Sequence, residues 1–475
     1  MLTPIYIKTI GIESFAIIGV TFSIQAIFLY LDMGFGTATT METAKLLALK
    51  QEKKISSLLR TGEISYWVIA ALLWGLFVLF SNVVSQLWLS SVPLERFNLS
   101  LIIPLIGGVV FGLWPFLFYN GALLGLQRSD ILNGITIVVV TIRGGCSLLT
   151  LFFISPTVEA FLAVNVLTSF LQSIICAFSL RKLIQFSGFD FRIIPEIAKK
   201  SLKFSGVGLL GILIFHVDKV IVSRFVDLRD FGYYSFSWML IYGMFGFCSI
   251  LTTYFGPRFS YLINLKDEKA LLETYYQACQ WMSVLIIPAT LFFLFFSCPI
   301  LNYWCRDPIL AANTSPLSAL FIGGSCLFAL CYLPQALQTA HSWMSLTLKM
   351  QSAAMIAWIA MLIGFVRILG VEGAGIAWVI LQLGYLVVYI ELMHRKLLID
   401  QKKKWWIDAV FKPALGPLSI GFICWAVLSP LIDGFLGIAL LFAIALAMFV
   451  SSALAVRSLR VKFLTFARPR NFIGS

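Results

Sequence analysis

Runs of about twenty apolar residues recur along most of the chain, and they constrain its fold more than any other feature. A helix needs about 20 predominantly apolar residues to cross the hydrocarbon core of a bilayer. We identify thirteen such runs, at residues 15–36, 64–89, 99–124, 131–154, 158–180, 206–226, 231–255, 281–303, 317–339, 353–369, 374–392, 410–431 and 435–456. The sequence therefore predicts an all-α polytopic membrane protein with about thirteen transmembrane helices.

The composition excludes most other classes of protein. Hydrophobic residues make up 60% of the chain and charged residues 12%, whereas soluble proteins carry about 25% charged residues. Such a chain has too little polar surface to cover a soluble globule. The sequence also shows no metal-ligand cluster, no paired catalytic carboxylates and no nucleophile–base arrangement. We therefore expect no enzymatic activity, no metal and no cofactor.

The positive charge of the chain follows the pattern of membrane topology. Most of the 35 Lys and Arg residues fall in alternate loops and in the C-terminal tail. Because cytoplasmic loops carry the excess of Lys and Arg, these loops and the C-terminus are predicted to be cytoplasmic, and the N-terminus of this chain to be outside. The +13 net charge is thus a topology signal, and nucleic acid is not an expected partner.

Arg143 is the sharpest functional candidate, because it lies in the middle of the apolar run TIVVVTIRGGCSLL. A charge at this depth costs about 3 kcal/mol or more unless it faces a partner or a water-filled cavity. It could be an internal arginine bonded to neighbouring carbonyl groups, but we favour a position in the wall of a hydrophilic cavity. Since arginine binds phosphate through paired donors, a cationic cavity predicts a phosphorylated or acidic substrate.

The run ILIFHVDKVIVSRFV has the highest density of charge within a predicted span. His216 and Lys219 fall near one helical face, and together with Arg224 they are assigned to the same cationic cavity as Arg143. Structural pairing is the alternative, and Arg224 is close enough to the outer end to reach the headgroups. Asp218 and Lys219 point about 100° apart on a helix, so we expect each to pair with another helix and not with its neighbour.

Asp32 and several glycines add further expectations. Asp32 ends the first span in LDMGFGTATT, where it could remain ionised as a functional group or cap the helix that follows. Gly108 and Gly112, and Gly121 and Gly125, are spaced so that helices could pack closely against them.

The chain is predicted to form two helical lobes. We assign residues 1–180 to an N-terminal lobe, 181–205 to a basic amphipathic cytoplasmic linker, 206–396 to a C-terminal lobe, and 397–475 to a basic loop, two additional transmembrane helices and a cytoplasmic tail. A weak internal repeat supports two lobes, because IESFA at 12–16 resembles LRDFG at 228–232. Parallel repeats of this kind are typical of transporters.

Three segments together resemble a known family: TPIYIKTIGIESFAIIG, LDMGFGTATTMETAK and HVDKVIVSRFVDLRDFGYYSFSWML. They are similar to the polysaccharide transporter family, above all the O-antigen or oligosaccharide flippases (Wzx-type), within the multidrug/oligosaccharidyl-lipid/polysaccharide exporter superfamily. The resemblance implies two pseudo-symmetric lobes around a central cavity in the bacterial inner membrane. It implies that the N-terminus of this chain is periplasmic and that an undecaprenyl-pyrophosphate-linked oligosaccharide is translocated from the cytoplasmic to the periplasmic leaflet.

The resemblance also implies roles, an energy source and partners. Pyrophosphate would bind Arg143 and Lys219, and Asp218 or Asp32 would carry the coupling ion of a proton or sodium gradient. The expected partners are the lipid-linked oligosaccharide, membrane lipid, a polysaccharide polymerase and a chain-length regulator. Family members have a helix before the TPIY-like segment, so we expect that the first family helix is missing from this chain.

The sequence leaves two other functions open. A cation-coupled exporter of drugs or small molecules, from the same superfamily, is the nearest rival. A membrane-embedded polysaccharide polymerase or glycosyltransferase is less well supported, because such enzymes usually carry a sizeable outer loop and the predicted outer loops here are short.

Overall fold

Every regular element in the described part of the chain is a helix. The structure is a computed structural model, and it describes residues 2–30, 35–81, 83, 97–184, 188, 190, 195, 216–341, 343–428, 432 and 434–456. This helical architecture confirms the predicted all-α fold.

The described helices also confirm a multi-pass membrane protein. Ten are long and apolar enough to cross a membrane, and Ile12–Gln25 is a shorter apolar helix. All but one of the predicted spans overlap these helices. The exception is 206–226, which lies mostly outside the described residues, although 216–222 are helical. Two predicted spans, 353–369 and 374–392, are joined in one element that is kinked at Gly370.

The chain divides into two compact units, Met1–Ser235 and Phe236–Ser475, and the division falls within helix α11 (Leu228–Asn264). The predicted linker at 181–205 lies largely outside the described residues. The predicted lobe boundaries therefore stay a prediction.

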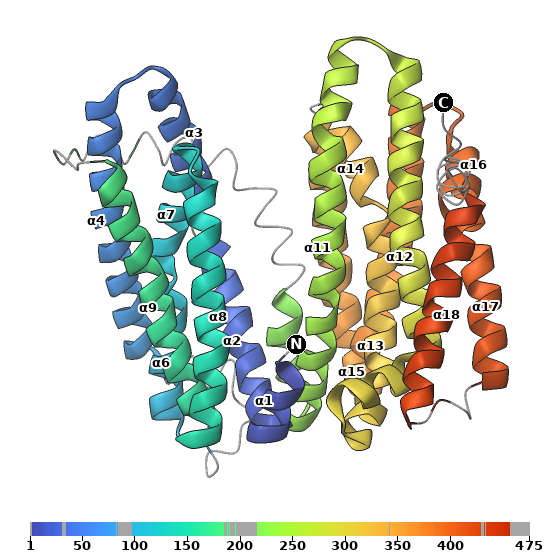
Figure 1. The fold of residues 1–475 in the computed structure, drawn as a ribbon, viewed down its shortest axis with the longest axis horizontal. Helices are drawn as coiled ribbons and strands as arrows, with labels where there is room; N and C mark the ends of the chain where they lie inside the picture. Colours follow the sequence, from blue (N-terminus) through green and yellow to red (C-terminus); the bar gives the residue numbers. More distant parts are fainter. Residues whose placement is uncertain are drawn as a thin grey trace, which may run out of the picture. The chain divides into compact units, whose positions relative to one another are not determined.

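Unit 1 is a bundle of helices that run roughly along a common direction (Figure 1). It contains α1 (Thr3–Ile10), α2 (Ile12–Tyr30), α3 (Phe35–Ala48), α4 (Glu52–Leu79), α6 (Leu99–Gly112), α7 (Trp114–Gly125), α8 (Ser129–Phe153), α9 (Val158–Leu183), the helical residues 216–222 and the start of α11. Gly11, at φ 85°, separates α1 from α2 in a conformation that glycine adopts without strain.

Glycines let the helices of unit 1 approach closely. A Cβ atom on Gly121 of α7 would lie 2.3 Å from the carbonyl oxygen of Gly36 on α3, and one on Gly125 would also meet α3. Cβ atoms on Gly108 and Gly112 of α6 would lie 2.9 Å from side chains of α9. A side chain at any of these positions would collide with the neighbouring helix, so glycine allows the close approach. The predicted role of these glycines in close packing is confirmed.

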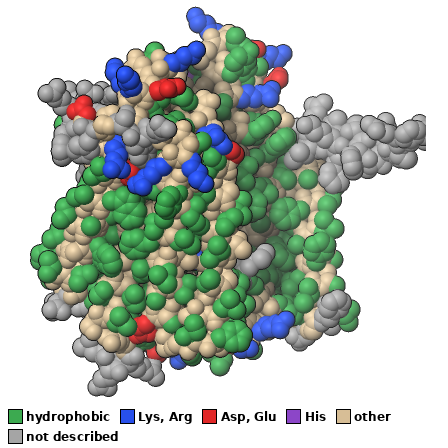
Figure 2. All heavy atoms as spheres, turned by 60° about the vertical axis from the view of Figure 1, so that its left-hand side comes forward, with side chains coloured by type: hydrophobic (Ala, Val, Ile, Leu, Met, Phe, Trp, Pro, Cys, Tyr) green, Lys and Arg blue, Asp and Glu red, His purple; other side chains and the backbone are tan. Residues whose placement is uncertain are grey.

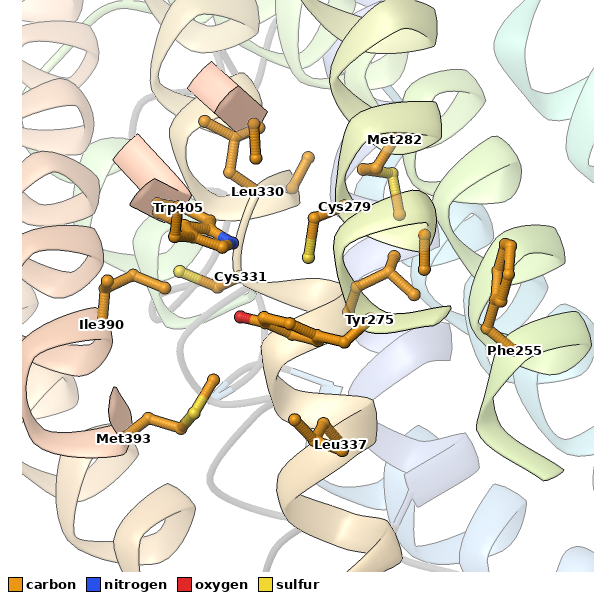
Figure 3. Close-up of a cluster of buried hydrophobic side chains, with 14 of the residues drawn as sticks. Phe255, Tyr275, Cys279, Met282, Leu330, Cys331, Leu337, Ile390, Met393 and Trp405 are labelled. Carbon is orange, nitrogen blue, oxygen red and sulfur yellow. The ribbon is translucent and has the colours of Figure 1, made fainter. Parts of the chain in front are cut away.

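Unit 2 contains the rest of α11 and the helices that follow it. These are α12 (Glu268–Cys305), α13 (Pro308–Ala329), α14 (Tyr332–Ala340), α15 (Met344–Leu397), α16 (Lys402–Trp405), the π-helix η1 (Trp406–Phe411), α17 (Lys412–Leu428) and α18 (Gly434–Ala455). A large apolar core joins α12, α14, α15 and α16, in which Tyr275, Cys331 and Trp405 converge (Figure 3). This core anchors the short α16 to the long helices around it.

The surface has the distribution expected of a membrane protein. On the face shown in Figure 2, hydrophobic side chains cover the middle of the helices, and most of the Lys and Arg side chains in view gather toward one end. Helix α8 contributes exposed apolar side chains to its surface, among them Ile137, Val138, Val140, Phe152 and Phe153. Side chains of this kind are suited to contact with lipid chains.

Candidate functional site

Arg143 lies in the middle of α8 and is held by two polar side chains of α9. Its Nε donates to Oγ1 of Thr168 at 3.0 Å, and one Nη donates to Oε1 of Gln172 at 3.3 Å. Thr168 Oγ1 in turn donates to the backbone carbonyl of Val164 at 2.9 Å, which orients its lone pairs toward the guanidinium. Among the described residues, the hydrogen-bond partners of Arg143 are thus side chains and not backbone carbonyl groups.

The electrostatics of this arrangement favour binding of an anion. Both described partners of Arg143 are neutral, so they position the guanidinium without neutralising its positive charge. The other Nη of Arg143 makes no hydrogen bond to the described residues, and the side chain is only half-buried. A planar guanidinium with free donors is suited to bind phosphate oxygens in pairs.

The polar face of α9 was missed in the sequence analysis. Asn165, Thr168, Ser169, Gln172 and Ser173 are all buried, although they belong to a predicted membrane span. Their spacing of three and four residues is the signal that could have revealed them, because it places them on one side of a helix. Ser173 Oγ donates to the carbonyl oxygen of Gly112 on α6 at 2.8 Å, so this face also ties α9 to its neighbour.

Asp218 and Lys219 form an ion pair with each other, and the expectation that they would not is wrong. Lys219 Nζ lies 3.4 Å from Oδ2 of Asp218, and both side chains are almost completely buried. The lysine side chain is long and flexible enough to bend back to its neighbour, and burial strengthens the attraction between opposite charges. The expected partner on another helix exists for Asp218, because Tyr234 of α11 donates a hydrogen bond to its Oδ2.

The other predicted site residues differ in their surroundings. His216 is buried, and its Nδ1 has no hydrogen-bond partner among the described residues. Arg224 is exposed, beyond the end of the helical residues 216–222. Asp32 lies outside the described residues. Arg143 bonds to side chains of α9, whereas Lys219 pairs with Asp218, so these contacts place the two cations in different surroundings.

Glu63 is a buried acid that the sequence analysis did not identify. Its side chain on α4 is 2% exposed and accepts hydrogen bonds from Arg60 at 3.2 Å and from Arg181 of α9 at 3.0 Å. Tyr119 of α7 donates to the same carboxylate at 2.9 Å and accepts from Trp67 at 2.9 Å. Glu63 lies just before the apolar run at 64–89, and only the fold reveals its partners.

The described residues include no group of three or more His, Cys, Asp or Glu side chains that could hold a metal ion. The expectation that the protein has no metal or cofactor stays a prediction.

Comparison with solved structures identifies the fold. The chain is similar to an inward-facing multidrug resistance MATE family transporter of the MOP superfamily, with a TM-score of 0.66, 14% identity, and coverage of 84% of this chain and 94% of that chain. It is similar to the lipid II flippase MurJ, with a TM-score of 0.65, 15% identity, and coverage of 96% and 97%. A MOP superfamily transporter from Pyrococcus furiosus matches with a TM-score of 0.55, 15% identity, and coverage of 84% and 91%.

Comparison of the sequence with known proteins and protein families identifies the family of the chain. No curated protein matches the chain. The model of a family described as polysaccharide biosynthesis protein matches residues 11–304, which is more than half of the chain. The match includes Arg143, the polar face of α9 and the Asp218–Lys219 pair, and it confirms the family that the sequence resembles. The chain belongs to the polysaccharide biosynthesis protein family and has the fold of MOP superfamily transporters.

Proposed function

We propose that the protein is a flippase for an undecaprenyl-pyrophosphate-linked oligosaccharide, an O-antigen or exopolysaccharide repeat unit. It moves this lipid from the cytoplasmic to the periplasmic leaflet of the bacterial inner membrane, and it acts as a transporter and not as an enzyme. Membership of a polysaccharide biosynthesis family supports the type of cargo. The fold shared with the lipid II flippase MurJ supports the type of movement.

The single observation that carries the proposal is the setting of Arg143. A cation in the middle of a membrane helix is energetically costly unless it faces a charged partner or a water-filled cavity. The described partners of Arg143 on α9 are neutral side chains. The pyrophosphate of a lipid-linked sugar is an anion that must pass the apolar middle of the bilayer. Arg143 would bind its oxygens at that depth through the donors that Thr168 and Gln172 leave free.

Ion-coupled alternating access is the mechanism that we propose for this movement. A proton or sodium gradient supplies the energy, and Asp218 or Asp32 carries the coupling ion. Asp218 is suited to this role because its carboxylate is buried and already bound by a cation and a hydroxyl group. A proton or sodium ion would compete with Lys219 for the same carboxylate. We further propose a polysaccharide polymerase and a chain-length regulator as partners.

The test is deletion of the gene in its host, followed by analysis of surface polysaccharide and of lipid-linked intermediates. We expect loss of the surface polysaccharide and accumulation of the lipid-linked repeat unit. Normal polysaccharide with no trapped intermediate would overturn the proposal. Complementation with Arg143→Ala is expected to fail at wild-type levels of inserted protein, whereas Arg367→Ala, which removes an exposed arginine elsewhere, should complement.

A cation-coupled exporter of drugs or small molecules is the second candidate, supported by the equally strong structural likeness to a multidrug resistance transporter. The same deletion strain distinguishes the two functions. Loss of an exporter predicts increased susceptibility to drugs and no change in lipid-linked sugars. Loss of a flippase predicts accumulation of lipid-linked sugars.

A further inference from the structure

A pocket of about 340 Å³ lies in unit 2 where α15 ends and α16 begins. We call it the α15–α16 pocket, and the residues that matter for its chemistry are Glu391, Arg395, Leu398, Ile399, Lys402 and Lys403. The Tyr276 hydroxyl lies 3.0 Å from the backbone carbonyl oxygen of Gln401 and 3.1 Å from its side-chain oxygen, and its one proton is shared between these acceptors, which fixes the turn beside the pocket. The pocket is therefore built on a turn that is tied to α12.

The pocket carries an excess of positive charge. Glu391 accepts hydrogen bonds from both Arg395 and Lys402, so one carboxylate is shared by two cations. Lys403 is exposed and makes no ion pair or hydrogen bond to the described residues. The exposed acid Asp400 also lines the pocket and offsets one charge. The three cations still outnumber the two acids, so the pocket favours an anion.

Two further lysines, each next to a lining residue in the sequence, are held by aromatic rings. Lys396 Nζ lies 4.0 Å from the ring centre of Trp343, and Lys404 Nζ lies 4.7 Å from that of Tyr276. A cation over an aromatic face is attracted by the ring and keeps its charge. These contacts hold two more positive charges close to the turn.

The surroundings of the pocket are amphipathic. Leu398 and Ile399 line it, and the Ile399 side chain is 70% exposed. Trp406, in the helical turn that follows, is partly exposed, and tryptophan is enriched at the level of the lipid headgroups. A free phosphate ion would use only the cations, whereas a phospholipid would use the cations and the apolar side chains together.

We propose that the α15–α16 pocket binds the phosphate of an anionic phospholipid from the surrounding membrane. Lys403 contacts the phosphate oxygens together with Arg395 and Lys402, the two cations that share Glu391. The glycerol and first acyl carbons lie over Leu398 and Ile399. Clusters of Lys and Arg next to a membrane helix attract anionic lipids in this way. The bound lipid is separate from the transported cargo and does not depend on the proposed flippase activity.

The test is a lipid titration of the purified full-length protein in detergent, read by native mass spectrometry. Phosphatidylglycerol is compared with phosphatidylcholine for the wild type, Lys403→Gln and Lys269→Gln. Lys269 is a matched control, because it is an exposed lysine without an ion pair in the described residues and lies on α12, outside the pocket. Lys403→Gln should weaken phosphatidylglycerol binding about fivefold, the effect of one basic residue near anionic lipid, and Lys269→Gln should not.

Three outcomes would overturn the proposal. One is equal binding of the two lipids by the wild type. Another is an equal effect of Lys403→Gln and Lys269→Gln on phosphatidylglycerol binding. The third is displacement of phosphatidylglycerol by inorganic phosphate, which would mean that the pocket binds a free anion and not a lipid. Unchanged phosphatidylcholine binding by Lys403→Gln serves as the check that the variant is folded.

Discussion

Arg181 at the end of α9 places a guanidinium nitrogen 3.0 Å from the carboxylate of Glu63 on α4. Residues 118 positions apart in the sequence are thereby joined through a side chain that is almost completely buried. Arg60 binds the other oxygen of the same carboxylate, and Tyr119 brings in α7. One acid therefore ties three helices of unit 1 together.

Glu63→Gln should lower the thermal stability of the protein. The variant keeps the shape of the side chain but removes its charge, so the hydrogen bonds from Arg60, Arg181 and Tyr119 are weakened. The two arginines are 40% and 50% exposed and can turn to solvent, so we expect a loss of about 1–2 kcal/mol, less than for a fully buried pair. Thermal unfolding in detergent, followed by tryptophan fluorescence, measures the change.

Asp130→Asn is the control for this prediction, because it removes the acid of an ion pair with Arg128 in which the aspartate is 65% exposed. Exposed pairs contribute little to stability. Equal melting temperatures of Glu63→Gln and the wild type would show that the buried carboxylate does not hold the helices together.

Lys219→Met should be strongly destabilising, because it leaves the carboxylate of Asp218 buried without its cation. Breaking a buried ion pair in this way costs about 3–5 kcal/mol, whereas replacing both partners with apolar residues is often neutral. The double variant Asp218→Leu/Lys219→Met should therefore be more stable than Lys219→Met alone. The fraction of protein that survives heating, measured by size-exclusion chromatography, compares the two.

The double variant also separates structure from transport. If Asp218 carries the coupling ion, the double variant will fold but fail to restore surface polysaccharide in the deletion strain. Full complementation by a stable double variant would remove Asp218 and Lys219 from the transport mechanism.

Thr168→Val should reduce transport without preventing membrane insertion. The substitution preserves the shape of the side chain but removes the acceptor for Arg143 Nε, so the guanidinium is held by Gln172 alone. Loss of a hydrogen bond to a charged group predicts a fall in transport of about tenfold, measured as the rate of lipid-linked sugar translocation in vesicles. Thr136→Val is the matched control, because Thr136 lies on the same helix as Arg143 and its hydroxyl donates to the backbone carbonyl of Leu132 on that helix. Equal rates for the two variants would contradict a positioning role for Thr168.

Gly370→Ala should destabilise unit 2. Gly370 has φ 62° and ψ −144°, a conformation almost restricted to glycine, and it joins the two predicted spans within α15. A side chain there costs about 1–3 kcal/mol even though no atom lies within 4 Å of the new Cβ. Gly364→Ala, in the same element and also in open space, should be neutral or stabilising because alanine favours helix. Thermal unfolding that ranked the two variants the other way would show that the kink tolerates a side chain.

Much of the fold could be predicted because apolar runs report directly on membrane helices. The runs at 353–369 and 374–392 were separated correctly although the structure joins them in α15, since Gly370 interrupts the pattern in the sequence as well as the helix. The candidate site was predicted less completely. Arg143 stood out because a charge within an apolar run is conspicuous, whereas Thr168 and Gln172 are neutral and barely change the local hydropathy.

The sequence by itself determined the class of the protein, the approximate positions of its helices and the family, because these depend on local composition and on the order of short segments. Only the tertiary structure decided which groups the buried charges meet. A side chain such as that of Lys219 can bend toward its neighbour or reach for another helix, and the choice depends on the distances and the burial that packing creates. Glu63 shows the same principle, since its partners Arg181 and Tyr119 are distant in the sequence and are brought together only by the packing of α4, α7 and α9.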